Sequence, residues 1–219
     1  MEVLDKGFVR LVDHMGDDSR IVQSARVSYS KGTKTVREDA KLINYLLKNK
    51  HWTPFEMVTF TFHVKLPIFI ARQWMRHRAG SFNEVSARYS EMPDEFYIPS
   101  LERIKAQSKT NKQGSGDNLC SRTKEHARDI MEVNCLKAFA DYKTLLDMGV
   151  ARELARITLP LNLYTEFYWK VDLRNLFNFI ALRSDSHAQF EIQEYSNAIY
   201  SIIEPIVPHS CASFTESLK

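Results

Sequence analysis

The spacing of hydrophobic positions changes along this chain, and the change predicts a mixture of helices and strands. Apolar side chains recur at helical intervals between residues 37 and 48, with charged side chains on the opposite face. Residues 57–66 alternate apolar and polar side chains, which is typical of a half-buried strand. Pro67 suits the first turn of a helix that we expect to run from Ile68 to Arg78.

The middle of the chain combines a polar stretch with the longest predicted helix. Residues 106–121 have low hydrophobicity, and we expect them to form a mobile surface loop. An amphipathic helix is expected over 123–147 and a shorter one over 151–158, before Pro160. The apolar positions of the long helix are Ile130, Met131, Leu136, Phe139, Tyr142, Leu145 and Leu146.

The last third of the chain predicts a second strand and two more helices. Residues 164–171 are rich in aromatic and β-branched side chains, and Asp172 can cap a helix over 173–184. Ser186 and Gln189 have the spacing of a capping box for a final long helix. The expected fold class is therefore α+β, an antiparallel or mixed sheet packed with several helices in a single domain, 1–219.

Composition narrows the class of function. With 219 residues and 44% hydrophobic content, the chain can build a real core. The net charge of +3 is too balanced to indicate a nucleic-acid surface, and no apolar run reaches membrane-spanning length. The amino terminus does not resemble a signal peptide. Cys120, Cys135 and Cys211 form no CxxC pattern, which argues against a disulfide framework or a zinc site and favours a cytoplasmic protein.

One short window, residues 76–88, concentrates the candidate chemistry. It contains three arginines, a histidine, a glutamate and two serines, but no lysine. Arginine is the residue that clamps phosphates and carboxylates at two points. Gly80 and Asn83 interrupt the helical pattern, so we expect a helix end that leads into an anion-binding loop.

Helical projection places Gln73 and Arg76 in one sector, with Arg78 almost opposite. The two arginines would then serve two ligands, or one would reach a neighbouring subunit, or one would form an ion pair with Glu84 or another carboxylate. Farther along, Arg183 falls near the apolar side of its helix and needs a partner there. That partner is either a bound ligand or one of two carboxylates, Asp185 or Glu191.

Other site types find no support in the residues. No ligand spacing indicates a metal, and Gly114-Ser115-Gly116 lacks the rest of a dinucleotide fingerprint. No histidine base is fixed near Ser86 by local spacing, so a serine hydrolase is disfavoured. From the residues alone, we expect an arginine-rich pocket for one or more phosphorylated ligands.

Arg76-His77-Arg78, followed after seven residues by Ser86, resembles the signature of the flavin-dependent thymidylate synthases. Residues 51–56, 71–74, 159–162 and 182–189 resemble other blocks of that family. The similarity runs from near the amino terminus to about residue 200 and fails mainly in 106–121. The resemblance implies reductive methylation of dUMP to dTMP, with methylenetetrahydrofolate as the one-carbon donor, NADPH-reduced FAD as the hydride source, and tetrahydrofolate as a product. It also implies a homotetramer whose active sites are shared between chains.

The resemblance also assigns residues by position. Arg183 is the expected catalytic residue, placed against the uracil ring, whereas Ser86 is expected to position the substrate. The residues expected to bind dUMP are Gln73, Arg76, Glu84, Val85, Ser86, Ala87, Arg88, Arg156 and Arg183. Those expected to bind FAD are His51, Thr53, Glu56, Arg76, His77, Arg78, Glu84, Asp172, Arg174, Asn178 and His187. The family usually has asparagine where this chain has Asp172, which predicts a weaker or pH-sensitive flavin contact there.

Two other functions are compatible with parts of this pattern. A flavin-binding redox protein that acts on another nucleotide would keep Arg174 and Asn178 but would not need Gln73, Glu84 and Arg88. A non-catalytic RNA- or nucleotide-binding module would spread its basic residues along a face and interleave exposed aromatic side chains. The charge is local in this chain, which disfavours the binding module.

Overall fold

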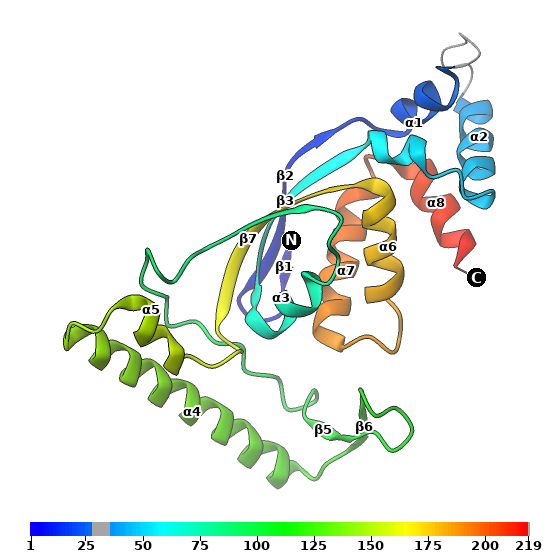
Figure 1. Ribbon diagram of the computed structural model, residues 1–219. Helices are drawn as coiled ribbons and strands as arrows, with labels where there is room; N and C mark the ends of the chain where they lie inside the picture. Colours follow the sequence, from blue (N-terminus) through cyan, green and yellow to red (C-terminus); the bar gives the residue numbers. More distant parts are fainter. Residues whose placement is uncertain (28–35, 219) are drawn as a thin grey trace.

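An antiparallel five-stranded sheet forms the centre of the protein (Figure 1). The computed structural model describes residues 1–27 and 36–218. The strand order is β1-β2-β3-β7-β4. The strands are β1 (Glu2–Val3), β2 (Gly7–Met15), β3 (Thr59–Pro67), β4 (Ser81–Glu84) and β7 (Tyr164–Asp172). The two strands that were expected from sequence, β3 and β7, pair with each other along their whole length.

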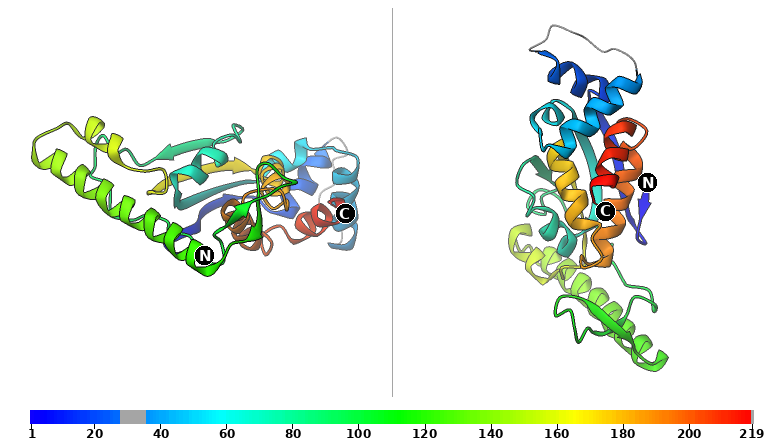
Figure 2. Two further views of the ribbon diagram at one scale, coloured as in Figure 1. Left: turned by 90° about the horizontal axis from the view of Figure 1, so that it is seen from below. Right: turned by 90° about the vertical axis from the view of Figure 1, so that its right-hand side faces the viewer.

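The alternating side chains of β3 and β7 bury one face of the sheet. Phe62 lies opposite Trp169 and Val64 opposite Phe167, and all four are buried. Figures 1 and 2 show two helices running along this face, α6 (Leu173–Arg183) and α7 (Phe190–Ile203). The α+β class predicted from the pattern of residues is therefore confirmed.

Aromatic contacts fix the short helix α3 (Ile68–Trp74) against α6 and the sheet. The Trp74 ring lies 4.6 Å from that of Phe179 on α6 and 5.3 Å from that of Trp169 on β7. All three side chains are fully buried. Each aromatic pair contributes about 0.5–1.5 kcal/mol beyond its buried area. The relative position of α3 and α6, which border the candidate site, is thus set by the core.

The remaining helices lie at the two ends of the sheet (Figure 1). Near one end are α1 (Asp18–Ala25), α2 (Val36–Lys48), the short helix η2 (Thr53–Met57) and α8 (Pro208–Ser217). At the other end are the long helix α4 (Ser121–Asp147), α5 (Arg152–Ala155) and η3 (Arg156–Thr158).

Helix α4 leaves much of its apolar surface uncovered within one chain. Tyr142 is buried in a small second cluster, as expected, but Ile130, Met131 and Leu136 are exposed. Of the apolar positions predicted for this amphipathic helix, Phe139, Tyr142, Leu145 and Leu146, all in the carboxyl-terminal half, are buried or partly buried. Only that half lies against η3 and the segment around Met92 and Phe96.

Two local predictions were wrong, and a third was incomplete. The helix expected to reach Arg78 ends at Trp74, because the chain must turn to pair Ser81 with Lys170 of β7. The stretch 106–121 contains a hairpin, β5 (Lys105–Gln107) and β6 (Ser115–Asn118). The expected capping box is absent, since Gln189 precedes α7 without a side-chain cap.

Candidate active site

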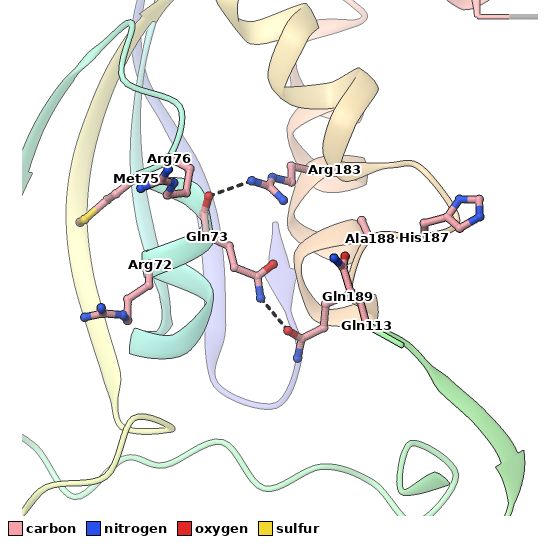
Figure 3. A pocket seen from close by; sticks show the side chains of 9 residues that line it. All are labelled: Arg72, Gln73, Met75, Arg76, Gln113, Arg183, His187, Ala188 and Gln189. Carbon is pink, nitrogen blue, oxygen red and sulfur yellow. Dashed lines mark hydrogen bonds between the residues drawn. The ribbon is translucent and has the colours of Figure 1, made fainter. Parts of the chain in front are cut away.

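A cleft of about 760 Å³ opens where α3, the end of α6 and the loop into α7 meet (Figure 3). Residues from four segments line it: Arg72, Gln73, Met75, Arg76, Gln113, Arg183, His187, Ala188 and Gln189. Four of them, Gln73, Arg76, Arg183 and His187, were expected at a ligand site from sequence.

Three hydrogen bonds join the walls of the cleft. The Arg183 guanidinium donates from Nη2 to the Gln73 carbonyl oxygen at 3.1 Å and from Nε to His77 Nε2 at 3.0 Å. The Gln73 side chain donates from Nε2 to Gln189 Oε1 at 2.6 Å, as Figure 3 shows. These bonds hold Arg183 in one orientation before any ligand arrives, which is the condition for electrostatic preorganisation.

The protonation state of His77 follows from the same contacts. Burial, together with the neighbouring Arg183 charge, lowers the pKa of His77 to about 4. The imidazole is therefore neutral near pH 7, and its Nε2 lone pair can accept the Arg183 Nε–H. Burial also lowers the pKa of Arg183, but a guanidinium stays protonated at neutral pH. Arg183 keeps its positive charge, and no described carboxylate pairs with it.

A second groove, of about 350 Å³, shares Arg76 and Arg183 with this cleft. Its lining includes Arg76, Arg78 and Asn178. The prediction that Arg76 and Arg78 point in opposite directions was wrong, because both follow the last turn of α3 and neither lies on a helix. The groove instead gathers two of the predicted flavin-binding arginines beside the predicted Asn178.

No carboxylate neutralises these arginines in the part of the chain that the structure describes. Of the partners that sequence left open for Arg183, Asp185 binds His187 and Glu191 binds Arg103. Glu84, the alternative partner in the arginine window, accepts a hydrogen bond from Thr165 Oγ1 at 2.7 Å. Two adjoining cavities thus share uncompensated positive charge, which fits anionic ligands.

The remaining predicted FAD residues surround the start of α6. Glu56 of η2 forms an ion pair with Arg174, one turn before Asn178. Thr53 begins η2, and the exposed His51 precedes it. These side chains come from two elements that pack together.

Asp172 occupies the cap of α6, as sequence predicted. Its carboxylate accepts hydrogen bonds from the backbone N–H of Asn175 at 3.0 Å and from the Asn175 side chain at 2.7 Å. Since Asn175 lines the second groove, Asp172 orients a groove side chain.

The other predicted dUMP residues lie in a different region of the chain. Glu84 ends β4, and Val85, Ser86 and Ala87 follow it. Arg88 forms an ion pair with Glu153 at 3.2 Å, and Arg156 follows directly after α5. Figure 1 places α5 well away from α6, which carries Arg183. One chain therefore presents the predicted dUMP residues in two separate sets.

The cleft also contains residues that sequence reasoning did not assign. Arg72, Met75, Ala188 and Gln189 flank predicted site residues, so proximity in sequence could have indicated them. Gln113 lies in the polar stretch that was expected to be a loop, and no sequence signal pointed to it. Its presence in the cleft depends on the hairpin.

Within residues 1–27 and 36–218, no group of three or more His, Cys, Asp or Glu side chains is arranged so that it could hold a metal ion. None of the helices in this range is both long enough and apolar enough to span a membrane.

Comparison with known proteins identifies the family. A family model described as thymidylate synthase complementing protein matches residues 10–209. The flavin-dependent thymidylate synthase of Treponema denticola is 56% identical over 219 residues, covering 100% of this chain and 82% of the relative. The enzyme of the same name from Thermus thermophilus is 57% identical over 216 residues, covering 99% and 78%.

A solved structure agrees with this assignment. The UMP/dUMP methylase PolB from Streptomyces cacaoi, bound with 5-Br dUMP, superposes with a TM-score of 0.89 at 32% identity. The match covers 99% of this chain and 97% of the PolB chain. With its arginine-lined cleft, its fold and its sequence in agreement, this chain belongs to the family of flavin-dependent thymidylate synthases.

Proposed function

We propose that this protein catalyses the reductive methylation of dUMP to dTMP. Methylenetetrahydrofolate supplies the one-carbon unit, and NADPH supplies two electrons through FAD. With one proton consumed, the products are dTMP, tetrahydrofolate and NADP⁺. The observation that carries the proposal is the set of three arginines, Arg76, Arg78 and Arg183, which border two cavities without carboxylate partners in the described residues.

The larger cleft suits a pyrimidine nucleotide. Arg76 offers an exposed guanidinium for a phosphate, while Gln73 and Arg183 offer donors to the polar edge of a base. A solved relative of the same fold carries 5-Br dUMP, which supports a uracil nucleotide as substrate.

The residues of the second groove fit FAD. Arg76 and Arg78 would hold the anionic diphosphate, and Asn178 and Asn175 would bind polar edges of the cofactor. Arg174, which pairs with Glu56, lies in the first turn of α6 beside Asn175. When bound, reduced FAD supplies the reducing equivalents that convert the transferred carbon to a methyl group.

Arg183 is the residue that we propose to be catalytic. Its charge lies in a partly buried position, fixed by Gln73 and His77. Negative charge that develops on the N3–C4–O4 edge of uracil would be stabilised there without reorganisation of the site. The uracil carbon then becomes more nucleophilic without covalent attack by a cysteine.

We further propose that several copies of the chain complete each active site, in a homotetramer. The separation of Arg183 from Ser86, Arg88 and Arg156 supports this arrangement, since none of these three residues lines either of the two cavities that contain Arg183. The exposed apolar side chains of α4 supply surface that a partner chain could cover.

A titration tests the nucleotide site. The protein is loaded with FAD, and the visible flavin spectrum is followed as dUMP is added. We expect a saturable spectral change that requires at least about tenfold more dUMP in an Arg76→Ala variant, because a charge-assisted bond is lost. Arg122→Ala, at an exposed position in the first turn of α4, is the matched control. The nucleotide site would be refuted if dUMP left the spectrum unchanged or if both variants behaved alike.

A further inference from the structure

The hairpin β5–β6 carries a polar side chain to the rim of the cleft. Gln113, in its turn, lines both the main cleft and an adjoining cavity of about 730 Å³. The two cavities share Gln113, His187, Ala188 and Gln189. Figure 3 shows Gln113 beside Ala188 and Gln189, at the end of the hairpin segment. The hairpin is therefore a wall of the candidate active site.

The turn of this hairpin is ordered by its own side chains. Ser108 Oγ accepts hydrogen bonds from the backbone N–H groups of Thr110 and Asn111, and Asn111 Oδ1 accepts from that of Gln113. The Gln107 side chain donates to the carbonyl oxygens of Lys112 and Gly114. These bonds tie the turn together as one unit, so its position depends on what holds the hairpin to the rest of the protein.

Arg103 is the main link. Its guanidinium donates from Nε to Glu191 Oε1 at 2.8 Å and from Nη2 to Glu191 Oε2 at 3.4 Å. The third nitrogen, Nη1, donates to Ser115 Oγ on β6 at 3.0 Å. In the described part of the chain, the other hydrogen bond from the hairpin to a different segment is a 3.5 Å contact between Lys124 and Asn118.

Glu191 is a firm anchor for this link. It lies in the first turn of α7, where the helix dipole stabilises a negative charge, and only 3% of its surface is exposed. Tyr97 also donates to Glu191 Oε1, at 3.1 Å. Because a buried carboxylate without a partner is very costly, the Arg103–Glu191 pair is strongly favoured. The bond from Arg103 Nη1 then fixes the position of Ser115 on β6.

The Gln113 carboxamide itself forms no hydrogen bond among the described residues, although it faces two cavities. A carboxamide combines one acceptor with two donors, which complements an imide edge, C(=O)–NH–C(=O). Both uracil and the flavin ring present such an edge. We propose that Gln113 contacts the imide edge of the nucleotide bound in this cleft, and that Arg103 is the positioning residue that holds Gln113 there. This inference rests on the proposed function for the identity of the ligand, but not for the link between Arg103 and the hairpin.

The positioning role is tested by hydrogen exchange of residues 105–118, without ligand. Arg103→Ala is expected to accelerate exchange of these amides by about tenfold or more, because charge-assisted bonds are lost. Ser115→Ala leaves the Arg103–Glu191 pair intact and should still accelerate exchange, whereas Gln113→Ala should not. Unchanged exchange in both Arg103→Ala and Ser115→Ala would overturn the positioning role.

The contact is tested by measuring the dissociation constants of dUMP and of FAD separately. Gln113→Ala should weaken the binding of either dUMP or FAD by about two- to tenfold. The ligand affected identifies whether Gln113 contacts the uracil ring or the flavin ring. Lys112→Ala, an exposed neighbour outside both cavities, should change neither constant. If Gln113→Ala matched Lys112→Ala for both ligands, the contact would be excluded. Wild-type protein that bound neither ligand would overturn the proposed function and the imide contact together, while the exchange data would still decide the role of Arg103.

Discussion

Replacement of Arg183 by alanine separates catalysis from binding. The change removes the hydrogen bonds that Arg183 donates to the Gln73 carbonyl oxygen and to His77 Nε2. It also removes a positive charge that is partly buried and borders both cavities. If its contact with uracil strengthens as the ring becomes anionic, the loss falls on turnover. Loss of one preorganised donor of this kind lowers kcat by about 10²–10³, or about 2.7–4 kcal/mol. Binding of dUMP should weaken by about tenfold or less, the size of one hydrogen bond.

The assay is steady-state dTMP formation, with kcat and KM for dUMP determined separately and dUMP binding measured independently. Arg183→Lys keeps the charge but cannot reproduce the two bonds to Gln73 and His77 at once, so its kcat should lie between those of wild type and Arg183→Ala. Arg122→Ala should behave like wild type, and thermal unfolding should show that all variants are folded. Normal kcat with only a raised KM in Arg183→Ala would refute the catalytic role.

Three further predictions follow from the site. The folded-state pKa of His77, about 4, lies below its ordinary value of 6.5, so the unfolded chain takes up a proton at a higher pH than the folded chain does. The free energy of unfolding should therefore fall as the pH drops from about 6.5 towards 4. Urea unfolding of a His77→Gln variant should show a smaller fall over the same pH range. Asp172→Asn retains the helix cap and should bind FAD more tightly, because an asparagine amide can also donate a hydrogen bond; unchanged FAD affinity would contradict this. If Arg183→Ala and Arg156→Ala are each impaired, mixing them should restore part of the activity after subunit exchange, whereas no recovery in a confirmed mixed oligomer would argue against shared sites.

Sequence predicted the parts of the fold whose signals are local. The alternation around Phe60 and Phe62 and the aromatic run of β7 identified two central strands correctly. Asp172 was placed correctly as a helix cap because a capping side chain bonds to residues only a few positions away. Such features need no information from distant parts of the chain.

Distant contacts decided where α3 ends and where β4 forms, and sequence missed both. β4 is short and largely polar, and it forms because β7, more than eighty residues later in the chain, offers its edge. That pairing also ended α3 early and brought Arg76 and Arg78 to one groove. Likewise, the arginine window predicted a site, but only the fold shows that Asp185 and Glu191 are engaged elsewhere, which leaves Arg183 with no carboxylate partner among the described residues.

The central claim is tested most directly by product analysis with the purified protein, dUMP, methylenetetrahydrofolate and NADPH, with and without added FAD. We predict dTMP formation that requires NADPH and increases with FAD until the protein is saturated, together with release of tetrahydrofolate. If FAD binds and is reduced but no dTMP forms, the claim is contradicted, and a flavin-binding redox protein that acts on another nucleotide becomes the better account.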